Sequence, residues 1–471
     1  MWETILKCCL YCLAAVTLIF VTPVAPPKLN QESKTTAIDG PCAEPTAPFR
    51  SYAERFDSQD TDWTKKNGAK GFKLIQCYPT EAPSPTETEL PWYDIEKKRA
   101  LDFHDAIEWE DYLRAVLRYC FEGGVLSAEV PQKKSEARWF HAPWMHSGGT
   151  GREPIHGLTY ERVSEPRELS PRQEARVQNW AVSVYNAPGG HVIGRVWENH
   201  NCPDATKARF KHGTVAIKLL FTEASIDQAP YLDGQGEHEW DAYVYKDLPE
   251  DPKRPNEGAK REIKRLRLLQ IDLAVRDERS EKTGWVFGTF VYHKDNGREA
   301  YRGCDIKKNP WCRAVPIGLM WGNDPNVPSG EPPQESYFND TAKLPEDLSK
   351  ARKGQIRLGW EGRLNGPVDN PESSCLSCHA TASWPQLDRV PPSNLGRDQK
   401  KQWFRNFRVD DDRQPFWPRT ETLDYSLQLS AGIRNFYQAH DGKSCKAGEG
   451  RPDSESGKDL PRQKVMRDSG Q

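Results

Sequence analysis

Cys375, Cys378 and His379 are the residues whose types and spacing suit a defined chemistry, because they form a Cys-x-x-Cys-His pattern. Two thiols at this spacing can add across the two vinyl groups of one porphyrin edge, and the adjacent imidazole can then reach the iron. The motif therefore predicts one covalently bound haem c. Cys375 and Cys378 would be the thioether anchors, and His379 would be the proximal iron ligand.

Two other uses of the cysteine pair have to be weighed against haem attachment. A zinc site needs a second pair of ligands at a similar spacing, and the sequence contains none. A redox dithiol belongs between a strand and a helix, whereas the residues 370–374 (Asn-Pro-Glu-Ser-Ser) are typical of a turn. A disulfide or dithiol remains the alternative, and it would make the chain a disulfide-stapled binding domain without haem.

The motif does not determine the sixth ligand of the iron. Four methionines occur in the sequence, and none lies between the motif and Met466 in the polar C-terminal tail. The distal candidates are therefore Met145, Met320 and His440, with an open five-coordinate iron as the remaining alternative. A saturated iron would cycle electrons, whereas an open iron would also bind small molecules.

The motif resembles that of the c-type cytochromes, and the layout more loosely resembles the cytochrome P460 family, in which a β-rich domain precedes one C-terminal Cys-x-x-Cys-His. The short parallels are His212–Lys218, Gly284–Phe290 and Ser374–Ala380. The first resemblance implies an electron carrier that cycles between Fe(II) and Fe(III). The second implies a haem oxidoreductase with an open distal site that acts on a small molecule, in a family that carries a lysine–haem cross-link. No catalytic residue is transferred beyond the three haem-binding ones.

The N-terminal segment indicates the compartment. An uncharged run from Cys8 to Ala25 follows a weakly positive start, and Pro26 and Pro27 end it. This pattern is typical of a signal peptide or an N-terminal membrane anchor, and we expect any membrane association through residues 8–25. The predicted location is periplasmic or otherwise exported, free or anchored to the inner membrane. Disulfides persist there, and Cys304 with Cys312 is the best candidate pair.

Composition and charge limit the kinds of partner. The 471 residues carry 66 Lys and Arg against 68 Asp and Glu, with a mean hydropathy of −0.81. These values exclude a polytopic membrane protein and a strongly basic nucleic-acid binder. Between residues 350 and 408, however, the sequence has 11 Lys and Arg and only 5 Asp and Glu. This local excess suits haem propionates and an acidic redox partner protein, but no nucleic acid is expected.

Hydrophobic periodicity predicts an α+β fold that is mainly β: an antiparallel sandwich or curled sheet with one amphipathic helix. The helix is expected over 94–121. A hairpin is expected from strands at 180–185 and 191–197, joined by Asn-Ala-Pro-Gly-Gly. Further strands are expected at 214–221, 241–245, 267–275 and 285–292.

Five segments follow from these patterns along the chain. They are a signal peptide or membrane anchor (1–25), a Pro-rich tether with loops (26–92), a β-rich domain with an N-terminal helix (93–322), a loop-rich haem c segment (323–440) and a disordered tail (441–471).

Overall fold

The computed structural model groups Gly40–Gln471 into one compact unit, and all of the elements below belong to it. The structure describes residues 72, 74–83, 90–93, 109–126, 137–145, 152–248, 260–295, 305, 309–339, 344–355, 357–385, 387–409 and 415–439. The N-terminal segment, the C-terminal tail, Cys304 and His440 lie outside these ranges. No helix within them is long and apolar enough to cross a membrane.

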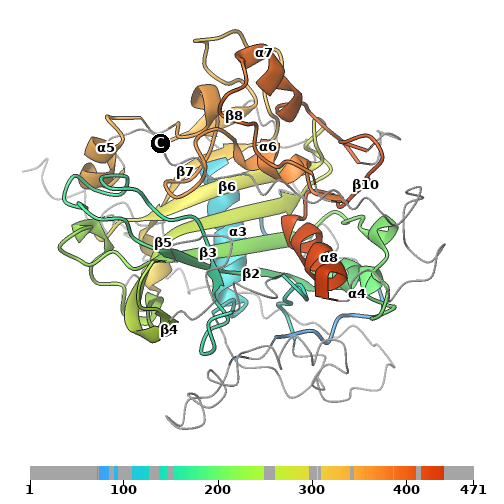
Figure 1. Ribbon diagram of the computed structural model, residues 1–471, viewed down its shortest axis with the longest axis horizontal. Helices are drawn as coiled ribbons and strands as arrows, with labels where there is room; N and C mark the ends of the chain where they lie inside the picture. Colours follow the sequence, from blue (N-terminus) through green and yellow to red (C-terminus); the bar gives the residue numbers. More distant parts are fainter. Residues whose placement is uncertain are drawn as a thin grey trace, which may run out of the picture. The chain divides into compact units, whose positions relative to one another are not determined.

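One eight-stranded antiparallel sheet forms the centre of this unit, in the order β1-β2-β3-β5-β6-β7-β8, with β4 paired to β5 (Figure 1). A short β9–β10 ladder lies outside it. The expected mixed, mainly β fold class is thus confirmed. The strands are β1 (Thr159–Tyr160), β2 (Asn179–Tyr185), β3 (Val215–Thr222), β4 (Glu239–Tyr245), β5 (Arg261–Arg276), β6 (Trp285–Tyr292), β7 (Ala314–Met320), β8 (Ser336–Phe338), β9 (Ser383–Trp384) and β10 (Glu421–Thr422).

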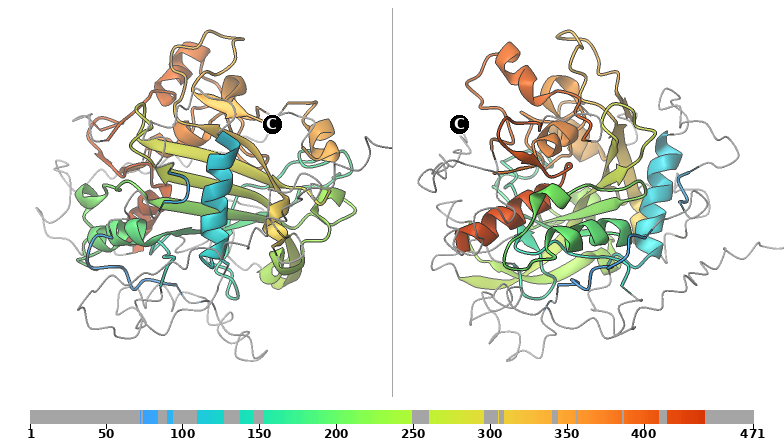
Figure 2. Two further views of the ribbon diagram at one scale, coloured as in Figure 1. Left: turned by 180° about the vertical axis from the view of Figure 1, so that it is seen from behind. Right: turned by 90° about the vertical axis from the view of Figure 1, so that its right-hand side faces the viewer.

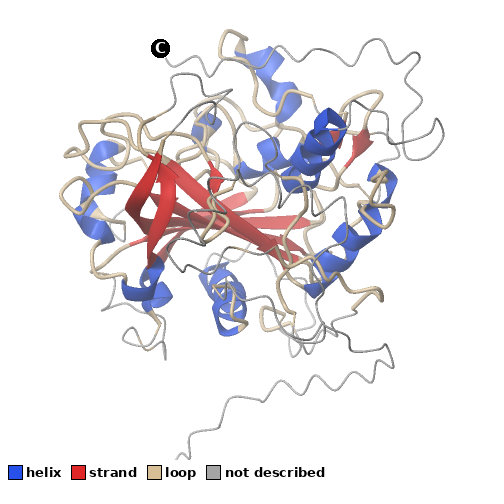
Figure 3. Ribbon diagram, turned by 60° about the horizontal axis from the view of Figure 1, so that its bottom comes forward, coloured by secondary structure: helices blue, strands red, loops and turns tan. Residues whose placement is uncertain are grey.

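Helices lie on both faces of the sheet (Figure 3). The long helix α3 covers one face, and the C-terminal helices α6 and α8 lie on the other (Figure 2). The α-helices of the described residues are α3 (Trp109–Glu122), α4 (Ala187–Val196), α5 (Glu346–Ala351), α6 (Cys375–Ala380), α7 (Arg397–Lys400) and α8 (Leu427–Ala439).

The two sheet faces bury two separate apolar clusters, because successive side chains of a strand point to opposite faces. On β6, Val286 and Phe290 pack with α3, whereas Phe287 and Val291 pack with the C-terminal segment. The cluster that contains Phe287 and Val291 also contains Leu376 of α6. The C-terminal segment therefore shares a core with the sheet.

The expected strand at 191–197 is wrong, because Ala187–Val196 forms helix α4. Asn186 caps this helix by accepting a hydrogen bond from the Gly189 amide, and Pro188 stands in its first turn. Both features favour a helix start, and they outweigh the β-branched residues that follow. The described part of the predicted helix is α3, and the other predicted strands are β2 to β6.

Strand β7 and helix α8 were not expected from the sequence, and both contribute to the apolar cluster on the side of α6. Cys312 is disulfide-bonded, as are Cys77 and Cys202. Its expected partner Cys304 lies outside the described residues, so this pairing stays a prediction.

Candidate functional site

Helix α6 carries the Cys-x-x-Cys-His motif, and its start is well determined. Ser374 caps it in a reciprocal capping box with Ser377, and the Ser374 hydroxyl also donates to Asn323 Oδ1 at 3.0 Å. Residues three and four apart share one face of a helix. The two cysteines and His379 therefore lie on the same side of α6.

The two motif thiols are free and half-buried, with no disulfide between them. Burial raises the pKa of Cys375 well above its usual value, and nearby Asp369 and Asp272 raise it further. Burial raises the pKa of Cys378 as well. Redox dithiols instead need a lowered pKa for the attacking thiol, so these surroundings do not favour dithiol–disulfide chemistry.

His379 is held in the tautomer that a metal ligand requires. Its Nδ1 donates to the backbone oxygen of Tyr425 at 2.8 Å, so the lone pair is on Nε2. The ring packs against Phe287, with centroids 4.8 Å apart. Burial lowers the pKa of His379 to about 4, which keeps the imidazole neutral at pH 7. Within the described ranges no hydrogen bond reaches Nε2.

A polar row on the sheet lies beside this helix. Ser183, Lys218, Asp272 and Thr289 are direct cross-strand partners on β2, β3, β5 and β6, so their side chains point to the same face. Thr289 Oγ1 donates to Asp272 Oδ1 at 2.9 Å and lies 3.8 Å from Cys375 Sγ. The row therefore reaches the attachment motif.

Hydrogen bonds tie this row to the chain around it. Lys218 Nζ donates to Glu161 Oε2 at 2.8 Å. Gln270 Nε2 donates to both oxygens of Asp272, at 2.9 and 2.8 Å, and to Asp369 Oδ2 at 2.9 Å. The site therefore contains three carboxyl groups and one lysine, all connected to the sheet.

These charges perturb one another strongly. Burial and the Asp369 charge raise the pKa of Asp272 to about 7, although Lys218 lowers it. Burial would lower the pKa of Lys218, but Glu161, Asp369 and Asp272 outweigh this effect and raise it. Lys218 is therefore cationic at neutral pH, whereas Asp272 is close to its midpoint.

Part of the sheet face next to α6 is only partly buried. Ala216, Lys218, Asp272 and Ala274 lie on central strands and point to the same face as a buried core, yet all four remain half-buried rather than buried. Two of them are alanines, so little side-chain volume stands above the sheet. Cys375 lies beside Thr289 of the polar row, so a group attached to the two thiols would lie next to this row.

The distal candidates lie in different settings. Met320 is fully buried on β7, directly across from Phe287. Met145 is buried in the same apolar cluster, and Asn435 of α8 donates to its backbone oxygen at 2.7 Å. His440 lies beyond the described part of the chain. The choice of a sixth ligand stays a prediction.

The structure brings the three segments of the sequence resemblance together, because Lys218 on β3, Phe287 on β6 and His379 on α6 all border the site. Sequence reasoning missed Asp272 and Asp369. Asp272 had a usable signal, since a charged residue in the apolar run Leu268–Val275 of an interior strand is unusual. Asp369 is in a loop and had no such signal.

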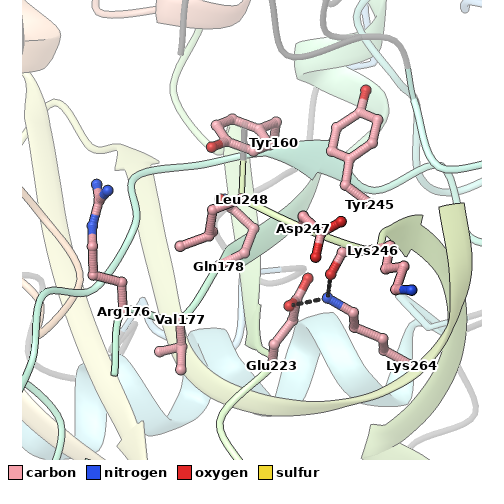
Figure 4. A pocket seen from close by; sticks show the side chains of 10 residues that line it. All are labelled: Tyr160, Arg176, Val177, Gln178, Glu223, Tyr245, Lys246, Asp247, Leu248 and Lys264. Atoms are coloured by element: carbon pink, nitrogen blue, oxygen red, sulfur yellow. Dashed lines mark hydrogen bonds and ion pairs between the residues drawn. The ribbon is translucent and has the colours of Figure 1, made fainter. Parts of the chain in front are cut away.

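Two cavities lie elsewhere and contain no residue of the motif. One of about 240 Å³ lies at the ends of β3 and β4 and is lined by Tyr160, Gln178 and the Glu223–Lys264 ion pair (Figure 4). The other, of about 280 Å³, is lined mainly by apolar side chains on the α3 side of the sheet, including Trp139 and Trp240.

No family model, no curated protein and no solved structure matches this chain. The proposals below therefore depend on the residues and geometry of the site.

Proposed function

We propose that this chain is a c-type haem protein, with one haem bound covalently through Cys375 and Cys378. One observation carries this proposal: α6 presents two free, uncharged thiols and a neutral imidazole on one side, next to the polar row of the sheet. When bound, the haem would supply a one-electron couple between Fe(II) and Fe(III). The simplest function is electron transfer with a redox partner protein.

The residues around the motif have defined roles in this proposal. His379 would hold the iron through Nε2, because the Tyr425 carbonyl oxygen holds Nδ1. Phe287 packs against the imidazole and limits its rotation. The raised pKa values keep both thiols, which would hold the haem covalently, protonated at neutral pH.

A second candidate function is a haem oxidoreductase that acts on a small molecule at an open iron. The polar row favours it, because Lys218, Asp272 and Thr289 place charge and exchangeable protons beside the attachment motif. An electron carrier needs no such groups, whereas oxidation of a substrate requires proton acceptors close to the reacting atoms. An exported location, with or without a membrane anchor, belongs to both proposals.

The test is expression through an export route with the haem c maturation machinery, followed by a haem stain of the denatured protein. The wild type is expected to retain stained haem, while Cys375→Ala with Cys378→Ala is expected to lose it. Cys120→Ala is the matched control, because Cys120 is a free, buried cysteine on α3. Absence of stain in the wild type would leave a disulfide-stapled binding domain.

Carbon monoxide then separates the two haem functions. A reduced spectrum that carbon monoxide leaves unchanged indicates a six-coordinate electron carrier. In that case Met145→Ala, Met320→Ala and His440→Ala would identify the ligand. A shifted spectrum indicates an open iron and favours the oxidoreductase.

A further inference from the structure

Two carboxylates of the site share one amide group. Gln270 Nε2 donates to Asp272 and to Asp369, and the Gly366 amide also donates to Asp369 Oδ2 at 2.8 Å. A Cβ on Gly366 would lie 2.1 Å from Gln270 Nε2, so this loop backbone packs tightly on the amide. The Asp369 charge held this close disfavours ionisation of Asp272.

Asp272 is also the carboxylate that connects to the haem attachment motif. Thr289 Oγ1 donates to it at 2.9 Å and lies 3.8 Å from Cys375 Sγ, the sulfur that would bond the porphyrin edge. A change of charge on the cofactor would therefore occur close to this carboxyl group, in surroundings that water screens only partly.

The titratable groups that face Asp272 come from three parts of the chain. Lys218 on β3 lowers its pKa, and Asp369 in the 366–370 loop raises it. The Cys375 thiol of α6 is uncharged at neutral pH. Burial adds to the effect of Asp369, and the pKa reaches about 7. A modest change in the local potential is then enough to move a proton on or off Asp272 near neutral pH.

We propose that Asp272 is a redox-linked proton site, which holds a proton when the haem is reduced and releases it when the haem is oxidised. This inference rests on the proposed haem function. Oxidation removes one electron to an external acceptor and adds one positive charge to the cofactor. Asp272 loses one proton to solvent, to which its side chain is partly exposed. Reduction reverses both transfers, so charge and atoms balance.

The test is the reduction potential of the haem-loaded protein, measured by spectroelectrochemistry from pH 5 to pH 9. For one proton per electron the potential is expected to fall by about 59 mV per pH unit over part of this range. In Asp272→Asn, which keeps the side-chain shape, this dependence should disappear while the absorption spectrum stays that of the wild type. Asp398→Asn, at an exposed carboxylate of α7, should behave as the wild type does.

Two further variants keep the test informative if Asp272→Asn folds poorly. Asp369→Asn removes the charge that raises the pKa of Asp272, so the pH-dependent window should move to lower pH. Lys218→Met removes the charge that lowers it, so the window should move to higher pH. A potential independent of pH, or a slope that persists in Asp272→Asn, overturns the inference but leaves the haem function intact. A wild type without covalent haem overturns both.

Discussion

The Asp424 side chain holds the turn that positions His379, and its removal gives a measurable prediction. Asp424 Oδ2 accepts from the Phe210 amide at 2.7 Å, and Oδ1 accepts from Trp285 Nε1 at 2.8 Å. Asp424 is buried and has a φ of 45°, and the next residue, Tyr425, provides the oxygen that binds His379 Nδ1. This carboxylate therefore connects the sheet to the motif.

Asp424→Ala would leave two buried donors without these partners. Each unsatisfied buried group costs about 1–3 kcal/mol, so the free energy of unfolding should fall by about 2–6 kcal/mol. Alanine also tolerates a positive φ less well than Asp or Asn. Urea denaturation followed by tryptophan fluorescence measures the change. In the haem-loaded protein, a less firmly held His379 should also alter the reduced absorption spectrum.

Asp424→Asn is the matched control, because its amide oxygen can still accept from Trp285 Nε1 and Asn suits a positive φ. This variant should lose about half as much stability as the alanine variant. The reasoning is refuted if Asp424→Ala unfolds at the same urea concentration as the wild type. The same holds if both variants lose the same amount.

Three further predictions concern the packing of α3 on the sheet, the cap of α6 and the charge of Asp272. Gly288→Ala would place a Cβ 2.2 Å from Leu113 Cδ2 of α3, so repacking should cost about 1–3 kcal/mol in urea unfolding; an unchanged midpoint would contradict this contact. Ser374→Ala removes the cap of α6 and should cost about 1 kcal/mol, with a lower yield of stained haem; full yield at wild-type stability would argue against the cap. The folded pKa of Asp272, about 7, exceeds the roughly 3.9 of an unfolded aspartate, so the folded state alone holds this proton between these values. The contribution of Asp272 to the free energy of unfolding should therefore fall as pH rises from about 4 to about 7. Unfolding curves of Asp272→Asn should lack this decline, and an identical decline in both proteins would assign it to another group.

Much of the fold could be predicted because the signals are local. Alternating residues such as Val215, Ile217 and Leu219 indicate one buried face of a strand, and β3 forms there. The prediction of a strand at 191–197 was wrong. Val192 and Ile193 favour a strand, but the N-cap at Asn186 starts a helix here. Helix α8 was missed, since its thirteen residues include a glycine and several polar side chains.

The motif residues of the site were evident from the sequence, but the groups around them were not. Asp272 and Asp369 are 97 positions apart in the numbering and meet through Gln270. No spacing rule connects a strand residue with a loop residue at that distance. The two become neighbours only because the C-terminal segment packs back onto the sheet.

The sequence by itself determined the attachment motif, its three candidate haem-binding residues and strands β2 to β6. These depend on residue types at short, fixed spacings, which the geometry of a helix or strand converts directly into shared faces. The tertiary structure decided that Lys218, Asp272 and Thr289 form one row beside Cys375, and that the Tyr425 oxygen orients His379. Strand register and long-range packing set these contacts, and both depend on how the whole core is filled rather than on any local pattern.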